Sequence, residues 1–257
     1  MTQVHDLAIV SSKAQLDEGV SVGPFSIVED GVVIGADTQI ASHVLVASGT
    51  TLGKECVLHH GAVVGTVPQD LKFRGEETTM EVGDRTVIRE FATLNRGTED
   101  QWKTVVGSDC LIMAYAHVAH DCVVGDHVIL ANSVALSGHV TIEDFAILGG
   151  FAKVHQFTRV GRHSFVGASF RVTMDVVPYI KVAGEPLKPL GLNTLGLKRR
   201  GFTPEGLAVL ERAFRLLFRS GLNTSQALAR MREELEPTEE VTSLIRFIEE
   251  SARGIVR

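Results

Sequence analysis

An aliphatic residue recurs at every sixth position over most of the first 172 residues of this chain. A period of six fits neither an α-helix, which repeats every 3.6 residues, nor a plain amphipathic strand, which alternates every two. It predicts short strands separated by tight corners, and we therefore expect a parallel β-helix with three faces and about 18 residues per coil. The recurring positions are Val10, Leu16, Val22, Val28, Ile34, Ile40, Val46, Leu52, Leu58 and Val64, then Val82, Ile88 and Leu94, and finally Val106, Ile112, Val118, Val124, Leu130, Leu136, Ile142, Leu148, Val154, Val160, Val166 and Val172.

The residue two places before each aliphatic position should also point inward, because successive side chains of a strand face opposite sides. Small or β-branched residues stand there: Val32, Thr38, Val44, Thr50, Cys56 and Ala62. Residues 66–81 and 97–105 break the repeat, and we expect both to be loops that leave the β-helix. Irregular segments on a rigid scaffold often carry function.

The six-residue repeat stops near residue 185. We therefore expect a β-helix over residues 1–185 and a C-terminal helical domain over residues 186–257. Capping and breaking residues place three helices in that domain. These begin at Thr203-Pro204 and end at Gly221, run from about Thr224 to Glu236, and start again near Thr238.

Composition excludes several classes of function. A formal net charge of −6 and an aromatic content of 6% argue against a nucleic-acid partner, which calls for a basic surface and stacking rings. Cys56, Cys110 and Cys122 form neither a disulfide framework nor a metal-binding spacing. We see no signal peptide and no apolar run near the ~18 residues of a transmembrane segment, so we expect a cytoplasmic protein.

The repeat places one histidine outside the core and beside a glycine. His120 lies two residues after the inward Val118, at a corner, and adding 18 residues stacks Gly138 on it. The same step stacks His139 on Asp121. A histidine with a glycine backbone N–H about 5 Å away along the stack suits acyl transfer, because the imidazole accepts a proton from an attacking hydroxyl while the N–H stabilises the oxyanion. Asp121 would orient the imidazole or tune its pKa.

Three further patches could serve a substrate, although each alone could equally be a solvated surface. They are Gln69-Asp70-Leu71-Lys72 in the first loop, Val154-His155-Gln156-Phe157 one coil beyond Gly138, and Lys198-Arg199-Arg200 ahead of the first helix. The basic triplet could meet a diphosphate or an acidic carrier protein.

With these residues in view, the chain resembles the UDP-N-acetylglucosamine O-acyltransferases, which perform the first step of lipid A synthesis. The resemblance covers nearly the whole chain. Its most specific segments are Ala116–Asp121, Gln69–Lys72, Val154–Phe157, Gly196–Phe202 and the ending Ala252–Arg257. It implies a left-handed β-helix, a homotrimer with sites between neighbouring copies, and transfer of an (R)-3-hydroxyacyl group from acyl carrier protein to the sugar 3-hydroxyl.

The resemblance also implies roles for individual residues. His120 would be the general base, Asp121 its helper, and Gly138 the donor of the oxyanion N–H. No metal and no cofactor is implied, because the donor chain is carried on the phosphopantetheine of acyl carrier protein. Contacts to the nucleotide sugar, the acyl chain or the phosphopantetheine would come from Asp70, Lys72, His117, His139, Gln156, Asn193, Arg199 and Arg200.

Two positions bear on specificity. Asn95 stands where the family commonly has histidine, which leaves open a 3-amino UDP-sugar as acceptor, giving an amide instead of an ester. Ala168 stands where side-chain size limits acyl length in the family. Alanine is larger than glycine, so we expect a medium chain.

Three rival functions share this fold. An acetyltransferase that uses coenzyme A would not be expected to carry the helical tail or the Gln69–Lys72 loop. A zinc carbonic anhydrase would need three histidine ligands, for which His117, His120 and His139 are the candidates. A non-catalytic scaffold would use the long surface of the solenoid for binding.

Overall fold

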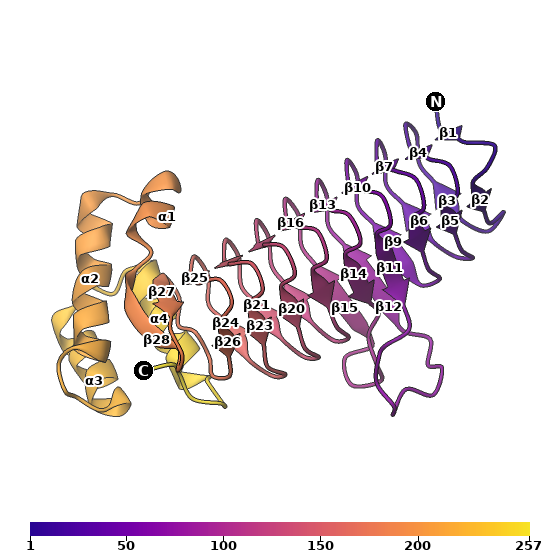
Figure 1. The fold of residues 1–257 in the computed structure, drawn as a ribbon. Coiled ribbons are helices and arrows are strands. Elements are labelled where there is room, and N and C mark those ends of the chain that lie inside the picture. The colour runs from indigo at the N-terminus through magenta and orange to yellow at the C-terminus, as the bar shows by residue number, and fades with distance from the viewer.

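The computed structural model, which describes residues 1–257, is a β-helix with helices packed at its C-terminal end (Figure 1). The strands β1 to β26 follow one another around three sheets, and each strand pairs in parallel with the strand one coil away. The N-terminus lies at one end of this coil and the helices α1 to α4 lie at the other.

Each sheet collects every third strand of the repeat. Sheet A contains β1 (Gln3–Val4), β4 (Ser21–Val22), β7 (Gln39–Ile40), β10 (Val57–Leu58), β13 (Val87–Ile88), β16 (Leu111–Ile112), β19 (Ile129–Leu130), β22 (Ile147–Leu148), β25 (Phe165–Val166), β27 (Ile180–Ala183) and β28 (Lys188–Leu192). Sheet B contains β2 (Ile9–Val10), β5 (Ile27–Val28), β8 (Leu45–Val46), β11 (Val63–Thr66), β14 (Thr93–Asn95), β17 (His117–Val118), β20 (Ala135–Leu136), β23 (Lys153–Val154) and β26 (Arg171–Val172). Sheet C contains β3 (Gln15–Leu16), β6 (Val33–Ile34), β9 (Thr50–Leu52), β12 (Thr79–Val82), β15 (Lys103–Val106), β18 (Val123–Val124), β21 (Thr141–Ile142) and β24 (Arg159–Val160).

The core consists of the residues that the period of six points inward. Every recurring aliphatic position from Val22 to Val172 is buried, and the small residues two places earlier are buried as well. Val10 and Leu16 are only partly buried, because no earlier coil covers them at the open N-terminal end. The predicted inward pattern is therefore confirmed. The inward side chains of successive coils stack along the axis, where apolar burial and dispersion contacts stabilise the fold.

Tight corners join the three sheets, and we name them AB, BC and CA after the sheets that they connect. Most corners contain a non-glycine residue in the left-handed backbone region, for example Tyr115 at AB, Asp121 at BC and Phe145 at CA, with φ of 62°, 59° and 61°. Such residues repeat at the same corner from coil to coil, so their side chains form columns along each edge of the β-helix.

Both predicted loops leave the β-helix at the BC corner. The first separates β11, which ends at Thr66, from β12, which begins at Thr79, and the second separates β14, ending at Asn95, from β15, starting at Lys103. Figure 1 shows the two excursions side by side. The repeat is resumed in register after each of them, since β12 pairs with both β9 and β15.

The C-terminal region begins with an element that the sequence did not predict. β27 pairs in parallel with β25 and then turns back as an antiparallel hairpin with β28, so the predicted boundary at 185/186 falls in the turn of this hairpin. The helices that follow are α1 (Thr194–Arg199), α2 (Pro204–Phe218), α3 (Thr224–Glu234) and α4 (Glu239–Glu249). None of the helices is long and apolar enough to cross a bilayer.

Three of these helices begin where the sequence predicted. Thr203 caps α2, Asn223 and Gln226 form a capping box on α3, and Thr238 caps α4. The short helix α1, capped by Asn193, was not predicted, because only one of its residues, Leu197, is buried and it shows no apolar stripe.

Candidate active site

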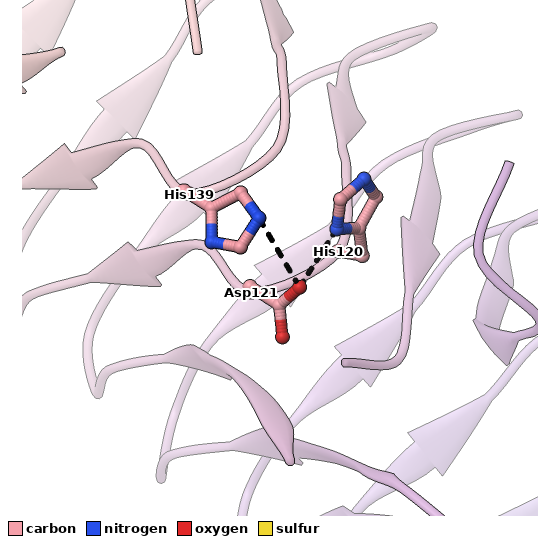
Figure 2. A group of neighbouring side chains, drawn as sticks. All are labelled: His120, Asp121 and His139. Atoms are coloured by element: carbon pink, nitrogen blue, oxygen red, sulfur yellow. Dashed lines mark hydrogen bonds and ion pairs between the residues drawn. The ribbon is translucent and has the colours of Figure 1, made fainter. Parts of the chain in front are cut away.

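A histidine–aspartate pair occupies the BC corner between β17 and β18 (Figure 2). The Nδ1 atom of His120 lies 2.7 Å from Oδ2 of Asp121. The Asp121 side chain is fully buried, whereas 15% of the His120 side chain remains exposed. The pair, which we call the dyad, therefore combines a buried carboxylate with an imidazole that solvent and ligands can reach.

The surroundings of Asp121 keep its carboxylate ionised. Burial alone would raise the pKa of Asp121, but hydrogen bonds from His120 and from the side chain and backbone of Thr98 hold the pKa below its usual range. An ionised Asp121 can only accept a hydrogen bond, so Nδ1 of His120 carries the proton that it donates to Asp121. The other ring nitrogen, Nε2, is then free to accept a proton. The dyad thus has the tautomer that a general base needs.

The contacts of the dyad predict how kcat/KM depends on pH. The hydrogen bond to Asp121 raises the pKa of His120, burial opposes this, and the charges of Asp121, Asp70 and Asp100 add to the increase. A base must be neutral to act, so kcat/KM should fall with decreasing pH around a midpoint above the ordinary histidine value of about 6.5. Replacing Asp121 by Asn should move that midpoint to lower pH. A pH–rate profile checks both, and a wild-type midpoint below 6 would contradict the account.

Gly138 lies against the imidazole, as the stacking of coils predicted. His117 pairs with Ala135 and His139 N donates to His120 O, which places the Gly138 corner one coil above the dyad. A Cβ at Gly138 would lie 2.5 Å from Cε1 of His120 and 2.7 Å from Nε2, so only glycine fits. The Gly138 N–H donates no hydrogen bond within the chain, which leaves it available to a ligand.

His139 joins the dyad from the next coil. Its Nε2 lies 3.6 Å from Oδ2 of Asp121 and 3.6 Å from Oδ2 of Asp100 in the second excursion. The ring stacks on Phe157 with centroids 4.5 Å apart. His120, Asp121 and His139 have ligand atoms within 4.8 Å of one another and could hold a metal ion.

His117 does not belong to this group. It lies on the outer face of sheet B, where its Nδ1 is 2.8 Å from Oγ1 of Thr93. Burial lowers the pKa of His117 below its usual range, which favours the neutral ring. The group with possible ligand atoms close together is His120, Asp121 and His139. The three histidines that a zinc anhydrase would use, His117, His120 and His139, are therefore not brought together.

The first excursion brings Asp70 and Lys72 to the same corner. Asp70 lies close enough for its charge to raise the pKa of His120, and its Oδ1 accepts a hydrogen bond from Lys72 N at 2.9 Å. The Lys72 side chain is exposed. Asn95, by contrast, is buried: its Nδ2 donates to Thr66 at the base of the excursion, and its Oδ1 has no donor.

The comparisons with known proteins agree with this geometry. A family model described as UDP N-acetylglucosamine O-acyltransferase, domain 2, matches residues 175–256, and a model of bacterial transferase hexapeptide repeats matches residues 103–138. An acyl-(acyl-carrier-protein)–UDP-N-acetylglucosamine O-acyltransferase from Chlorobaculum parvum is 50% identical over 255 residues, which cover 99% of this chain and 97% of the relative. The chain belongs to this O-acyltransferase family. The relative from Chlorobaculum tepidum is 53% identical over 248 residues, 96% of this chain and 94% of its own.

Solved structures of the same family share the fold. UDP-N-acetylglucosamine acyltransferase from Francisella novicida superimposes with a TM-score of 0.96 at 37% identity, over 99% of this chain and 94% of that chain. Together with the sheet topology, this confirms the predicted fold class, a left-handed parallel β-helix of hexapeptide repeats with a C-terminal helical region.

The O-acyltransferase chain does not bring all predicted site residues together. Asn193 is buried beside the CA corner, where its Nδ2 donates to His163 O at 3.0 Å and its Oδ1 caps α1. Arg200 stacks over Phe145 at the same corner, 4.7 Å from the ring centroid, and Arg199 next to it is exposed. These residues therefore lie on a different edge of the β-helix from the dyad.

Of the two remaining predicted residues, Gln156 shares the edge of the dyad and Ala168 lies on another edge. Gln156 is exposed at the BC corner, one coil beyond Gly138. Ala168 is exposed at the AB corner, between β25 and β26, and packs on the Gly149 corner of the previous coil. In a single chain the three corners thus carry the dyad, the C-terminal contacts and the proposed length-setting residue separately.

The sequence did not reveal the residues that hold the dyad. Thr98 in the second excursion donates twice to Asp121, and Thr104 Oγ1 accepts from Asp121 N at 2.8 Å. The one available signal was that residues 97–105 break the repeat, which predicted a loop but singled out none of its side chains.

Proposed function

We propose that the chain transfers an (R)-3-hydroxyacyl group from acyl carrier protein to the 3-hydroxyl of UDP-N-acetylglucosamine, the first step of lipid A synthesis. The observation that carries this proposal is the dyad lying directly beneath the unpaired N–H of Gly138. Acyl carrier protein and UDP-N-acetylglucosamine are the two substrates in the names of the relatives. The reaction requires no metal or cofactor besides the phosphopantetheine of the carrier, and the three buried free thiols fit a reducing cytoplasm.

The reaction proceeds by direct transfer. Nε2 of His120 accepts the proton of the sugar hydroxyl as its oxygen bonds to the thioester carbon. The Gly138 N–H donates to the oxygen that becomes negatively charged in the tetrahedral intermediate. The C–S bond then breaks, and the proton on Nε2 passes to the departing thiolate. Asp121 stays ionised and stabilises the imidazolium between the two steps.

The chain works as a homotrimer with composite sites. The dyad occupies the BC corner, whereas Asn193 and Arg200 lie at the CA corner, so a substrate that contacts both must lie between two copies. Apolar side chains also form a stripe on the outer face of sheet A, which a neighbouring copy would cover. These partly exposed residues are Val57, Val87, Leu111, Ile129, Ile147 and Phe165.

Mixing two inactive variants tests the composite site. His120→Ala removes the base from one corner and Arg200→Ala removes a substrate contact from another, so each homotrimer should have little activity. In co-expressed random mixtures, about one quarter of sites would receive both intact residues from different copies, and activity should return to about that fraction. The control is each variant expressed alone, which forms only homotrimers of that variant. No recovery in verified mixed trimers would place both residues in one chain's site.

Ala168 predicts the length of the donor chain. The family resemblance assigns Ala168 to the end of the bound acyl chain, and alanine is larger than glycine, so (R)-3-hydroxyacyl donors of C10–C12 should be preferred over C14 and longer. Ala168→Gly should extend the preference, since each additional buried methylene contributes about 0.8 kcal/mol. Rates over a series of carrier-bound donors measure this. Undiminished turnover of C14 and longer donors by the unaltered chain would refute the assignment.

The choice of acceptor can be tested with the same donors. UDP-N-acetylglucosamine and its 3-amino analogue would be offered at equal concentration, and kcat/KM compared. The proposed function predicts transfer to the 3-hydroxyl. Transfer to the amino sugar alone would make the product an amide and link acceptor choice to Asn95. Transfer to neither sugar from any donor would reject the proposed function.

A further inference from the structure

The carboxylate of Asp121 depends on Thr98 for most of its hydrogen bonds. Thr98 N donates to Oδ1 at 2.8 Å and Thr98 Oγ1 donates to Oδ2 at 2.6 Å. Oδ2 is the same atom that His120 Nδ1 meets at 2.7 Å. The carboxylate is fully buried, so no water can replace a missing donor without opening the site.

Thr98 is itself fixed within the second excursion. Its hydroxyl accepts from Asp100 N at 3.3 Å, which directs the hydroxyl proton toward Asp121. Its carbonyl accepts from Trp102 N at 2.7 Å, and the neighbouring Gly97 carbonyl accepts from Thr78 Oγ1 at 2.6 Å. Only 7% of Thr98 is exposed. Hydrogen bonds therefore hold the second excursion at both ends of its turn, with Thr98 directed at Asp121.

We infer that Thr98 is a positioning residue of the dyad: its paired donors lock the Asp121 carboxylate so that Oδ2 faces His120 Nδ1. Thr98 bonds to Asp121 and not to the His120 ring, so its effect on the base passes through Asp121. This inference rests on the proposed function, in which His120 is the base. It also explains why the second excursion leaves the β-helix at the BC corner, one coil before the dyad.

The consequence for His120 has a definite sign. A carboxylate that can rotate spends less time bonded to Nδ1, and that hydrogen bond is the largest cause of the raised pKa of His120. Losing the Thr98 hydroxyl should therefore lower the pKa of His120 and misplace its ring. A change that only weakened the fold would alter stability and leave this pKa where it is.

The test uses three variants of the full chain. Thr98→Val removes the hydroxyl at nearly constant volume and should lower kcat about 10–100-fold, the worth of a hydrogen bond to a charged group. Thr98→Ser keeps the hydroxyl and should stay within a few-fold of the unaltered chain. Thr86→Val removes a similarly buried hydroxyl, bonded to Gly107 O at 2.7 Å away from the dyad, and should leave kcat unchanged.

Two further measurements separate positioning from general disruption. In an Asp121→Ala background, adding Thr98→Val should lower kcat by less than about twofold. Thr98 acts through Asp121, so the effects of the two substitutions should not add. NMR titration of 13C-labelled histidines, with His120→Gln to assign the resonance, should show a lower pKa of His120 in Thr98→Val. The titration requires no substrate.

The outcomes are distinguishable. An unchanged pKa of His120 in Thr98→Val, or a full loss of rate in the Asp121→Ala background, would overturn the inference. A lowered pKa in a chain that shows no acyl transfer would support the positioning role and reject the proposed function instead.

Discussion

His120→Ala is expected to lower kcat about 10³-fold while the chain remains folded. The imidazole of His120 combines a partly exposed ring, a buried carboxylate partner at 2.7 Å and a neighbouring unpaired N–H. General base catalysis contributes about 10²–10⁴-fold. The effect should fall on kcat more than on KM, because the proton is transferred only in the transition state.

Two controls accompany His120→Ala. His5→Ala changes an exposed histidine at the far end of the β-helix and should leave kcat unchanged. The oligomeric state and thermal unfolding of His120→Ala should match those of the unaltered chain, since the side chain contributes little to the core. Transfer within tenfold of the unaltered rate would remove His120 from the role of base.

Gly138→Ala is expected to lower kcat/KM about 100-fold through a single added methyl group. The new Cβ would meet Cε1 and Nε2 of His120 at 2.5 and 2.7 Å, so either the imidazole or the corner must move. A displacement of about 1 Å at a reacting group costs on the order of 10²-fold. In the proposed reaction the same corner supplies the oxyanion N–H, so the substitution should disturb both catalytic contributions together.

Gly206→Ala is the matched control for this substitution. A Cβ at Gly206 meets only Thr203 Oγ1, at an ordinary 3.6 Å, and the change lies in the first turn of α2. It should leave transfer unaffected. Overpacking at Gly138 should cost about 1–3 kcal/mol of unfolding free energy, which thermal or denaturant unfolding would measure. A Gly138→Ala chain that transfers acyl groups within a few-fold of the unaltered rate would contradict the proposed contact.

Periodicity predicted most of the fold because each coil repeats the same physical problem. An aliphatic residue every sixth position must be buried, and stacking by 18 residues then places Gly138 on His120 and His139 on Asp121 without further information. The N-caps of α2 and α4 were equally local signals, since Thr203 and Thr238 act on the turn that follows them.

The remaining features depend on contacts between segments that have no common period. Thr98 reaches Asp121 across 23 residues from an irregular excursion, so no local pattern connects them. Asn193 and Arg200 lie on another edge from the dyad because β27, β28 and α1 lead the chain to the CA corner. The sequence resemblance grouped these residues by role and could not place them on separate edges of one chain.

The most direct test of the account is a transfer assay with the unaltered chain, UDP-N-acetylglucosamine and an (R)-3-hydroxyacyl carrier protein of medium chain length. The account predicts a product with the mass of the 3-O-acylated nucleotide sugar, formed without added metal and with release of the free carrier thiol. A folded chain that forms no acylated sugar from any donor, or that needs stoichiometric zinc for its activity, would contradict it.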